Sequence, residues 1–216
     1  MSDETREAAR RLCATGRRAV DLGLSPGSSG NVSARVGDLT LMSPTGVSLR
    51  DLDPENLAVL DAAGDHVAGP RPSKEFPLHL AMYRRVGGAG AVVHLHSAHA
   101  SAASCLPAWS ASSALPPVTP YLVMRVGQAP LVPYAAPGSD RLAHNVAVLP
   151  GRFRAALLAN HGSLVAAADP EAALDGAIEL EEASRIVVSL RGGEFAVLAK
   201  EDVRELTERY GTTWDM

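Results

Sequence analysis

Three histidines and one carboxylate are the residues of this chain whose types and spacing favour metal chemistry. His94 and His96 lie two positions apart in the apolar run 92–97. In a β-strand, residues two apart point to the same face, so their imidazoles would be neighbours. His161 lies between two further apolar runs, and Glu75 lies upstream. Three neutral imidazoles with one open coordination position are the ligand set of a catalytic zinc ion, since a closed shell would exclude substrate.

The composition is that of a folded globular enzyme. The 216 residues are 46% hydrophobic and 20% charged, which predicts one packed domain over 1–216. Aromatic residues make up only 4%, so the core must consist mainly of Ala, Val and Leu. The net charge of −4 and the scattered arginines provide no basic surface, and we therefore expect no nucleic-acid partner.

The sequence contains no recognisable signal for a membrane or for secretion. Residues 2–11 are charged and lack an apolar segment, and no stretch is long enough to span a bilayer. The two cysteines, Cys13 and Cys105, are far apart and lack metal-binding spacing. These features predict a cytoplasmic protein without a membrane partner.

Two loops rich in small residues flank a predicted pair of strands at 32–36 and 39–42. The loops are 25–31, SPGSSGN, and 43–46, SPTG. The preference of these residue types for turns is enough to explain each loop. Alternatively, exposed backbone N–H groups and hydroxyl side chains in such loops can hold an anion such as phosphate. Neither loop has the spacing of a Walker or dinucleotide-binding motif.

A rigid segment, 69–77, leads into a helix that is predicted from Pro77 to Arg85. Ser73, Lys74 and Glu75 therefore precede its first turn, where the helix dipole favours an anion. Glu75 could take part in the chemistry of the site, or it could only complement the helix dipole with its charge. His79, on the apolar face of the helix, is interpreted as a core histidine.

The remaining pattern alternates strands and helices, which by itself predicts only the α/β class. Helices are expected at 3–23, 98–106 with Ser97 as cap, 141–149, 170–190 and 200–210, and further strands at 57–60, 65–67, 155–159 and 163–168. The acidic residues Glu179, Glu181 and Glu182 are expected to lie mostly on the solvated face of their helix. His66 and His144 are expected to be exposed.

Five motifs, in this order, resemble the class II (zinc-dependent) aldolase family, which includes fuculose-phosphate aldolase and ribulose-phosphate 4-epimerase. They are GNVS at 30–33, SPTG at 43–46, SKE at 73–75, HLH at 94–96 and NHG at 160–162. The resemblance extends from about residue 8 to 190. It implies a three-layer α/β/α domain with a mostly antiparallel central sheet. It also implies a homotetramer with its sites at the subunit interfaces.

The resemblance also implies a role for each motif residue. His94, His96 and His161 would bind Zn²⁺, with Mn²⁺ or Co²⁺ as alternative ions, and Glu75 would be the acid/base. The substrate phosphate would be held by Gly30, Asn31, Thr45, Gly46, Ser73 and Lys74. Lys74 stands where family members commonly have a second serine, so it either adds a charge to the phosphate site or points elsewhere. Tyr121 would be a catalytic tyrosine reaching a neighbouring subunit's site, and Tyr210 resembles the aldolases' C-terminal tyrosine only weakly.

Within this family the chain is most similar to the branch that decarboxylates 3-oxo-tetronate 4-phosphate, on the segments 71–75, 94–97, 119–127 and 133–138. Loss of CO₂ from such a 3-oxo acid leaves an enediolate, as aldol cleavage does, so one site can serve either reaction. Glu75 would shuttle the proton if the partly closed site raises its pKa. Arg125 is the candidate partner of the substrate carboxylate, with a surface ion pair as the alternative.

Two other functions are compatible with the resemblance. One is aldol cleavage of a ketose phosphate such as L-fuculose 1-phosphate. The other is a non-enzymatic module like the adducin head, which loss of the metal ligands would favour. Here all three histidines and Glu75 are present. The sequence therefore predicts a lyase that acts on a small phosphorylated sugar or sugar acid.

Overall fold

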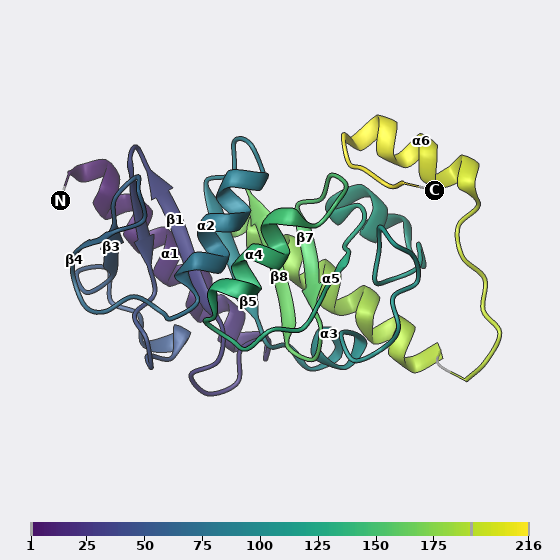
Figure 1. Cartoon of the computed structure of the whole chain (residues 1–216), viewed down its shortest axis with the longest axis horizontal. Helices are drawn as coiled ribbons and strands as arrows, with labels where there is room; N and C mark the ends of the chain where they lie inside the picture. The colour runs from purple at the N-terminus through teal and green to yellow at the C-terminus, as the bar shows by residue number, and fades with distance from the viewer. Residues whose placement is uncertain (1, 191, 216) are drawn as a thin grey trace.

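The computed structural model describes residues 2–190 and 192–215, and within them an eight-stranded sheet forms the centre of the molecule (Figure 1). The strand order is β4-β3-β2-β1-β5-β8-β7-β6. Neighbouring strands are antiparallel, apart from the parallel pair β6 and β7. The strands are β1 (Asn31–Val36), β2 (Leu39–Met42), β3 (Ala58–Leu60), β4 (His66–Ala68), β5 (Ala91–Leu95), β6 (Leu131–Val132), β7 (Ala155–Leu158) and β8 (Gly162–Ala167).

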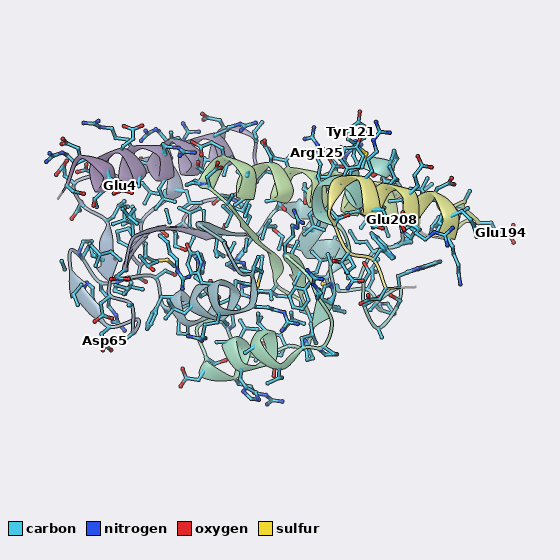
Figure 2. The ribbon with its side chains drawn as sticks, turned by 90° about the horizontal axis from the view of Figure 1, so that it is seen from above. Glu4, Asp65, Tyr121, Arg125, Glu194 and Glu208 are labelled. Carbon is cyan, nitrogen blue, oxygen red and sulfur yellow. The ribbon has the colours of Figure 1, made fainter. Side chains whose placement is uncertain are left out.

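Helices cover both faces of the sheet. The helices are α1 (Asp3–Asp21), α2 (Phe76–Arg85), α3 (Ala98–Ala103), α4 (Asp140–Val148), α5 (Pro170–Leu190) and α6 (Lys200–Tyr210), with a short 3₁₀ helix at Leu49–Asp51 and a π-helix, η2, at Leu122–Val126. Figure 2 shows α1 and α5 on one side of the sheet and α2 with α4 on the other. This arrangement confirms the predicted three-layer α/β/α fold with a mostly antiparallel sheet.

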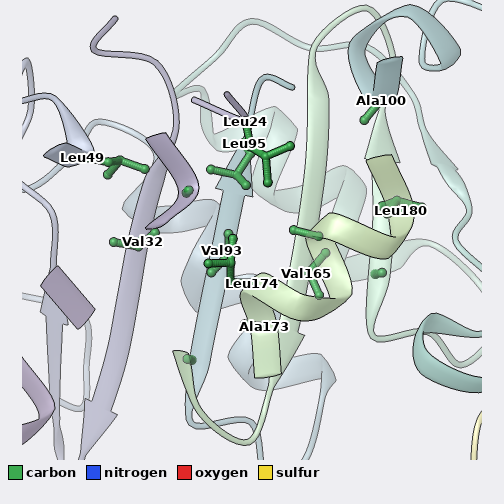
Figure 3. Close-up of a cluster of buried hydrophobic side chains, with 14 of the residues drawn as sticks. Leu24, Val32, Leu49, Val93, Leu95, Ala100, Val165, Ala173, Leu174 and Leu180 are labelled. Atoms are coloured by element: carbon green, nitrogen blue, oxygen red, sulfur yellow. The ribbon is translucent and has the colours of Figure 1, made fainter. Parts of the chain in front are cut away.

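The central strands of the sheet are buried on both faces because each face packs against helices, whereas the edge strand β4 is exposed. All five residues of β5 are buried. Val93 and Leu95 point into the apolar cluster formed with α1 and α5, which Figure 3 shows, whereas Val92 points into a second cluster under α2 and α4. Burying a side chain of this size stabilises the fold by about 1.5–3 kcal/mol. His94 shares the face of Val92 and is thereby held toward α2.

The alternation in β1 assigns its polar residues to one face. Asn31, Ser33 and Arg35 face α2, while Val32 and Ala34 belong to the opposite apolar cluster. Arg35 stacks its guanidinium 4.2 Å from the ring centroid of Tyr83 on α2. The polar side of β1 is therefore covered by a helix, and Ser33 is buried.

Two predicted elements end earlier in the structure, and one element was not predicted. The helix predicted over 98–106 ends at Ala103, because Pro107 disfavours the helical conformation at the residue before it and the chain closes in hydrogen-bonded turns. The strand predicted over 92–97 ends at Leu95, because its partner β8 begins at Gly162 and provides no pairing beyond Ser163. The π-helix η2 was not predicted.

No helix in residues 2–190 and 192–215 combines the length and apolar character needed to cross a membrane.

Candidate metal centre

The four residues singled out from the sequence converge on one point of the fold. Glu75 precedes α2, His94 lies in β5, His96 directly follows that strand, and His161 lies in the turn between β7 and β8. Their potential ligand atoms all lie within 4.8 Å of one another. The three imidazole rings meet edge to face, with centroids 4.6, 4.7 and 4.8 Å apart.

The tautomer of His94 follows from its hydrogen bond to the neighbouring strand. Nδ1 lies 2.7 Å from the carbonyl oxygen of Ser163. A carbonyl only accepts, so Nδ1 carries the proton and the neutral ring presents the lone pair of Nε2. Nε2 lies 2.9 Å from Nε2 of His96 and 3.4 Å from Oε2 of Glu75. The sheet thus orients this imidazole with its lone pair toward the cluster, as metal-binding histidines require.

His161 is held through its backbone. Its N–H donates to Ser104 Oγ at 3.1 Å, and its carbonyl accepts from Ser101 Oγ at 3.0 Å, so α3 fixes both peptide groups. Asn160 before it has φ of 55°, and a Cβ on Gly162 after it would lie 2.3 Å from the carbonyl oxygen of Leu95. This tight turn explains why Gly follows the histidine.

The carboxylate of Glu75 is buried and asymmetrically bound. Oε2 accepts a hydrogen bond of 2.9 Å from Asn31 Nδ2, whereas Oε1 lies 3.6 Å from His161 Nε2 and has no hydrogen-bond partner in the described chain. Burial raises the pKa of this carboxyl, but the close contact with His94, the hydrogen bond from Asn31 and the nearby His161 outweigh it and hold the pKa well below its usual range. The raised pKa that was stated as a condition for the shuttle role is therefore not found. Glu75 is a carboxylate that can accept a proton.

The donor set fits a divalent metal ion. Both ring nitrogens of His161 and Oε1 of Glu75 are buried without a hydrogen-bond partner in residues 2–190 and 192–215, and such orphaned groups are costly unless a ligand satisfies them. Burial, together with the neighbouring His94, lowers the pKa of His96 and of His161 to about 4. Neutral imidazoles with free lone pairs are the ligands that zinc and similar ions use.

The same shifts predict that the metal-free protein loses stability in mild acid. An unfolded histidine titrates near pH ~6.5, whereas His96 and His161 titrate at about 4 and His79 at about 3 in the fold. Above pH ~6.5 neither state binds these protons. Below it only the unfolded state does, so stability falls as the pH decreases toward 4.

Urea unfolding of the metal-free protein between pH 8 and pH 5 measures this effect, and we expect a constant midpoint above pH 7 and a decreasing one below. His144→Ala is the control, because His144 is exposed and its removal should leave the profile unchanged. A midpoint that does not change between pH 7 and pH 5 would contradict the expectation.

The predicted phosphate-binding residues lie at one end of the sheet, beside the cluster. Asn31 pairs with His94 across β1 and β5, and a Cβ on Gly30 would meet the carbonyl oxygen of His94 at 2.8 Å. The loop 43–46 lies against the segment before α2: Ser73 N donates to Ser43 O at 3.0 Å, and Thr45 N donates to Arg71 O at 3.1 Å. Thr45 and Gly46 are exposed. The structure therefore brings the candidate loops together next to the metal centre.

Lys74 is exposed, and its aliphatic stem lies along Gly138, where an added Cβ would be 2.9 Å from Cγ of Lys74. Its charge contributes to lowering the pKa of His96 and of His161. The positive charge of Lys74 therefore acts on the histidine cluster, and its role at the phosphate site stays a prediction.

Tyr121 and Arg125 lie on and beside η2, on the side of the molecule that carries α5 and α6 (Figure 2). Arg125 Cζ is 5.6 Å from the ring centroid of Tyr121, which is 54% exposed, and Arg125 acts electrostatically on Glu179 of α5. No hydrogen bond or ion pair among the described residues connects either residue with the histidine cluster. Within one chain, the structure does not bring them to the centre. Tyr210, near the end of α6, is 44% exposed.

Glu181 supports the centre from outside, and the prediction that it is exposed was wrong. It was expected to lie on a solvated face together with Glu179 and Glu182, yet it is buried and accepts hydrogen bonds from the backbone N–H groups of His99 and Ala100 at 3.0 and 2.7 Å. Ser97 is the N-cap residue of α3 but makes no side-chain capping bond, so Glu181 satisfies the first turn instead. It thereby fixes the helix that follows His96 and holds His161.

Comparison with known proteins agrees with this geometry. A sequence model of the family described as class II aldolase and adducin N-terminal domain matches residues 10–188. A 3-oxo-tetronate 4-phosphate decarboxylase of Pectobacterium atrosepticum is 40% identical over 208 residues, covering 96% of this chain and 95% of the relative. An L-fuculose phosphate aldolase of Escherichia coli is 31% identical over 213 residues, covering 97% and 96%. The crystal structure of YgbL from Escherichia coli superposes with a TM-score of 0.88 at 36% identity, over 94% of this chain and 98% of that one.

Proposed function

The chain belongs to the class II aldolase and adducin N-terminal domain family, and on this premise we propose that it is a metal-dependent carbon–carbon lyase that decarboxylates 3-oxo-tetronate 4-phosphate to dihydroxyacetone phosphate and CO₂. The observation that carries the proposal is the complete centre of three histidines and Glu75 in a chain more similar to the decarboxylase than to the aldolase relative. The intact centre gives no support to a non-enzymatic, adducin-like module.

His94, His96 and His161 are the proposed ligands of Zn²⁺, with Mn²⁺ or Co²⁺ as alternative ions. When bound, such an ion would supply Lewis-acid stabilisation of negative charge on the substrate oxygens. The chain's own contribution is to hold the three imidazoles neutral and converging, through the Ser163 carbonyl and through α3.

Glu75 is the proposed proton shuttle. Its lowered pKa keeps Glu75 ionised and therefore able to accept a proton, and Oε1, which has no hydrogen-bond partner in the described chain, is the oxygen that would take the proton of the substrate's 2-hydroxyl. Breaking the C1–C2 bond releases CO₂ and leaves the electron pair on C2, which then takes the proton back from Glu75. A solvent proton restores the hydroxyl. Proton transfer of this kind contributes about 10²–10⁴-fold to a rate.

The substrate phosphate is proposed to bind at the loops around Gly30, Asn31, Thr45, Gly46 and Ser73, with Lys74 beside them. The backbone N–H groups of Thr45 and Ser73 already donate within the protein. Their hydroxyl groups, the N–H of Gly46 and the second amide hydrogen of Asn31 are therefore the donors that we assign to the phosphate.

We also propose that the protein is a cytoplasmic homotetramer in which Tyr121 reaches the centre of a neighbouring subunit. The exposure of Tyr121 and Arg125 supports this arrangement, because neither contacts the cluster of its own chain in the part that the structure describes.

The role proposed for Arg125 is to bind the substrate carboxylate across such an interface. A guanidinium matches a carboxylate in two parallel hydrogen bonds, so we expect Arg125→Ala to raise the KM for the 3-oxo acid phosphate at least about tenfold, the loss of one charge-assisted bond. Steady-state kinetics measures this, with Arg50→Ala, which removes an exposed ion pair with Asp21, as control. An unchanged KM in Arg125→Ala would remove Arg125 from the carboxylate site.

The function is tested by incubating the zinc-loaded protein separately with 3-oxo-tetronate 4-phosphate and with L-fuculose 1-phosphate, and measuring CO₂ and dihydroxyacetone phosphate. We expect both products from the first substrate and neither from the second. Dihydroxyacetone phosphate from the second substrate alone would make the protein an aldolase, which the 31% identical relative makes the second candidate.

A further inference from the structure

A buried chain of hydrogen bonds runs from Glu75 away from the metal centre and ends inside the α2 face of the sheet. Asn31 Nδ2 lies 2.9 Å from Glu75 Oε2, and Asn31 Oδ1 lies 2.6 Å from His79 Nε2. His79 Nδ1 lies 2.7 Å from Ser33 Oγ, which in turn lies 2.9 Å from Tyr83 OH. All five residues are buried, and His79 is 1% exposed.

The carboxylate of Glu75, together with a neutral His79, fixes the direction of every hydrogen bond in this series. The carboxylate of Glu75 can only accept, so the Asn31 atom that faces it must be the NH₂ group. Oδ1 of Asn31 then faces His79 and needs a donor, so Nε2 of His79 carries the proton. In a neutral ring Nδ1 must accept, and the Ser33 hydroxyl donates to it. Tyr83 donates to Ser33. The five groups therefore permit one consistent arrangement.

Burying this polar network costs more free energy than burying apolar side chains in the same space would. A side chain at position 79 needs only bulk to fill the space between α2 and β1, where the neighbouring buried residues include Leu78 and Met82. Burying an imidazole, an amide and two hydroxyl groups is tolerated only because each finds a partner. A fully satisfied polar network of this kind fixes one orientation of its members rather than adding net stability.

We propose that His79 is a positioning residue that fixes the Asn31 amide and, through it, the orientation of the Glu75 carboxylate. This inference rests on the proposed function of Glu75 as proton shuttle and deepens it. With Oε2 held by Asn31, Oε1 is the oxygen left to face His161 and the substrate. Without the Nε2 proton of His79, the amide can turn over and present its oxygen to Glu75, which repels the carboxylate and releases it.

Two substitutions at position 79 separate positioning from packing. The amide nitrogen of glutamine reaches the place of Nε2, so His79→Gln retains the donor to Asn31. Asparagine is shorter and reaches only the place of Nδ1, so His79→Asn retains the contact with Ser33 and loses the donor. We expect His79→Asn to lower kcat about 10–100-fold, as loss of a supporting hydrogen bond in a metal site does. We expect His79→Gln to restore kcat to within about threefold of the wild type, with equal metal content in all three proteins.

A second readout is independent of activity. In the ¹⁵N-labelled protein, the side-chain NH₂ signal of Asn31, assigned by its absence in Asn31→Asp, should exchange slowly in the wild type and in His79→Gln and rapidly in His79→Asn. If the wild type shows this protection but does not decarboxylate the substrate, the positioning of Asn31 stands and the proposed function fails.

Ser33→Ala keeps the proposal testable if His79→Asn does not fold. Loss of the Ser33 hydroxyl removes the hydrogen bond that holds Nδ1, so the ring of His79 can turn away from Asn31; Asn31 should again lose protection, and kcat should fall about three- to tenfold. Equal losses in His79→Gln and His79→Asn would show that the histidine only fills space and would overturn the proposal. Wild-type kcat and protection in Ser33→Ala, or in folded His79→Asn, would overturn it as well.

Discussion

Replacement of His161 by alanine should abolish lyase activity and reduce the bound metal to well below one equivalent per chain. Four-ligand zinc sites in small domains bind with about 10–16 kcal/mol. An even share over four ligands makes one ligand worth about 2.5–4 kcal/mol, which is roughly 60- to 700-fold in affinity. The ring of this proposed ligand makes no hydrogen bond in the described chain, so its removal should leave the fold intact.

Metal analysis after dialysis, together with decarboxylation assays, measures this effect. His144→Ala is the matched control, because it removes an exposed histidine from α4 and should change neither quantity. Because α3 holds His161 through its backbone, the variant should keep the turn and its unfolding midpoint without metal. Full metal content in His161→Ala would show that His161 is not a ligand.

The sequence predicts the part of the centre that depends on local geometry. His94 and His96 are two residues apart, and this spacing alone places both imidazoles on one side of the chain, although the strand ends between them at Leu95. His161 cannot be assigned in this way. The sequence pattern named it as a third candidate, but its position depends on the pairing of Leu95 with Ser163 across 68 residues, which no local pattern contains.

The wrong prediction for Glu181 came from the acidic character of its segment, although its position along the helix indicated burial. Its position in a run of acidic residues favours a solvated face, yet Ala173, Ala177 and Glu181 follow each other at steps of four and share the buried stripe of α5. The periodicity outweighs the charge here because the backbone N–H groups of α3 satisfy the carboxylate. A buried acid on an apolar stripe therefore indicates a specific partner.

His79 was correctly predicted to be buried, but the prediction said nothing of its partners. Its spacing of four from Glu75 and the alternation of Asn31 and Ser33 in β1 were both visible in the sequence. What was missing is that α2 packs directly on β1, since that contact is tertiary. The same limit applies to the pKa of Glu75, whose direction is set by groups from three separate segments.

Replacement of Glu75 by glutamine should lower kcat by about 10²–10⁴-fold while the metal stays bound. Glutamine has the same shape and can still accept the hydrogen bond from Asn31, but it cannot take a proton from the substrate. Glu55→Gln, at an exposed glutamate, is the control and should retain full activity.

The metal content of Glu75→Gln decides between two roles that the geometry of the centre permits. Its carboxylate oxygens lie close enough to the imidazoles to serve as a fourth ligand, since all the potential ligand atoms are within 4.8 Å. A carboxylate that binds the ion would close the coordination shell and could not also shuttle the proton. We expect full metal content with lost turnover, because Asn31 holds Oε2 and leaves Oε1 toward the substrate. Parallel loss of metal and activity would make Glu75 a ligand and leave the proton shuttle to another group.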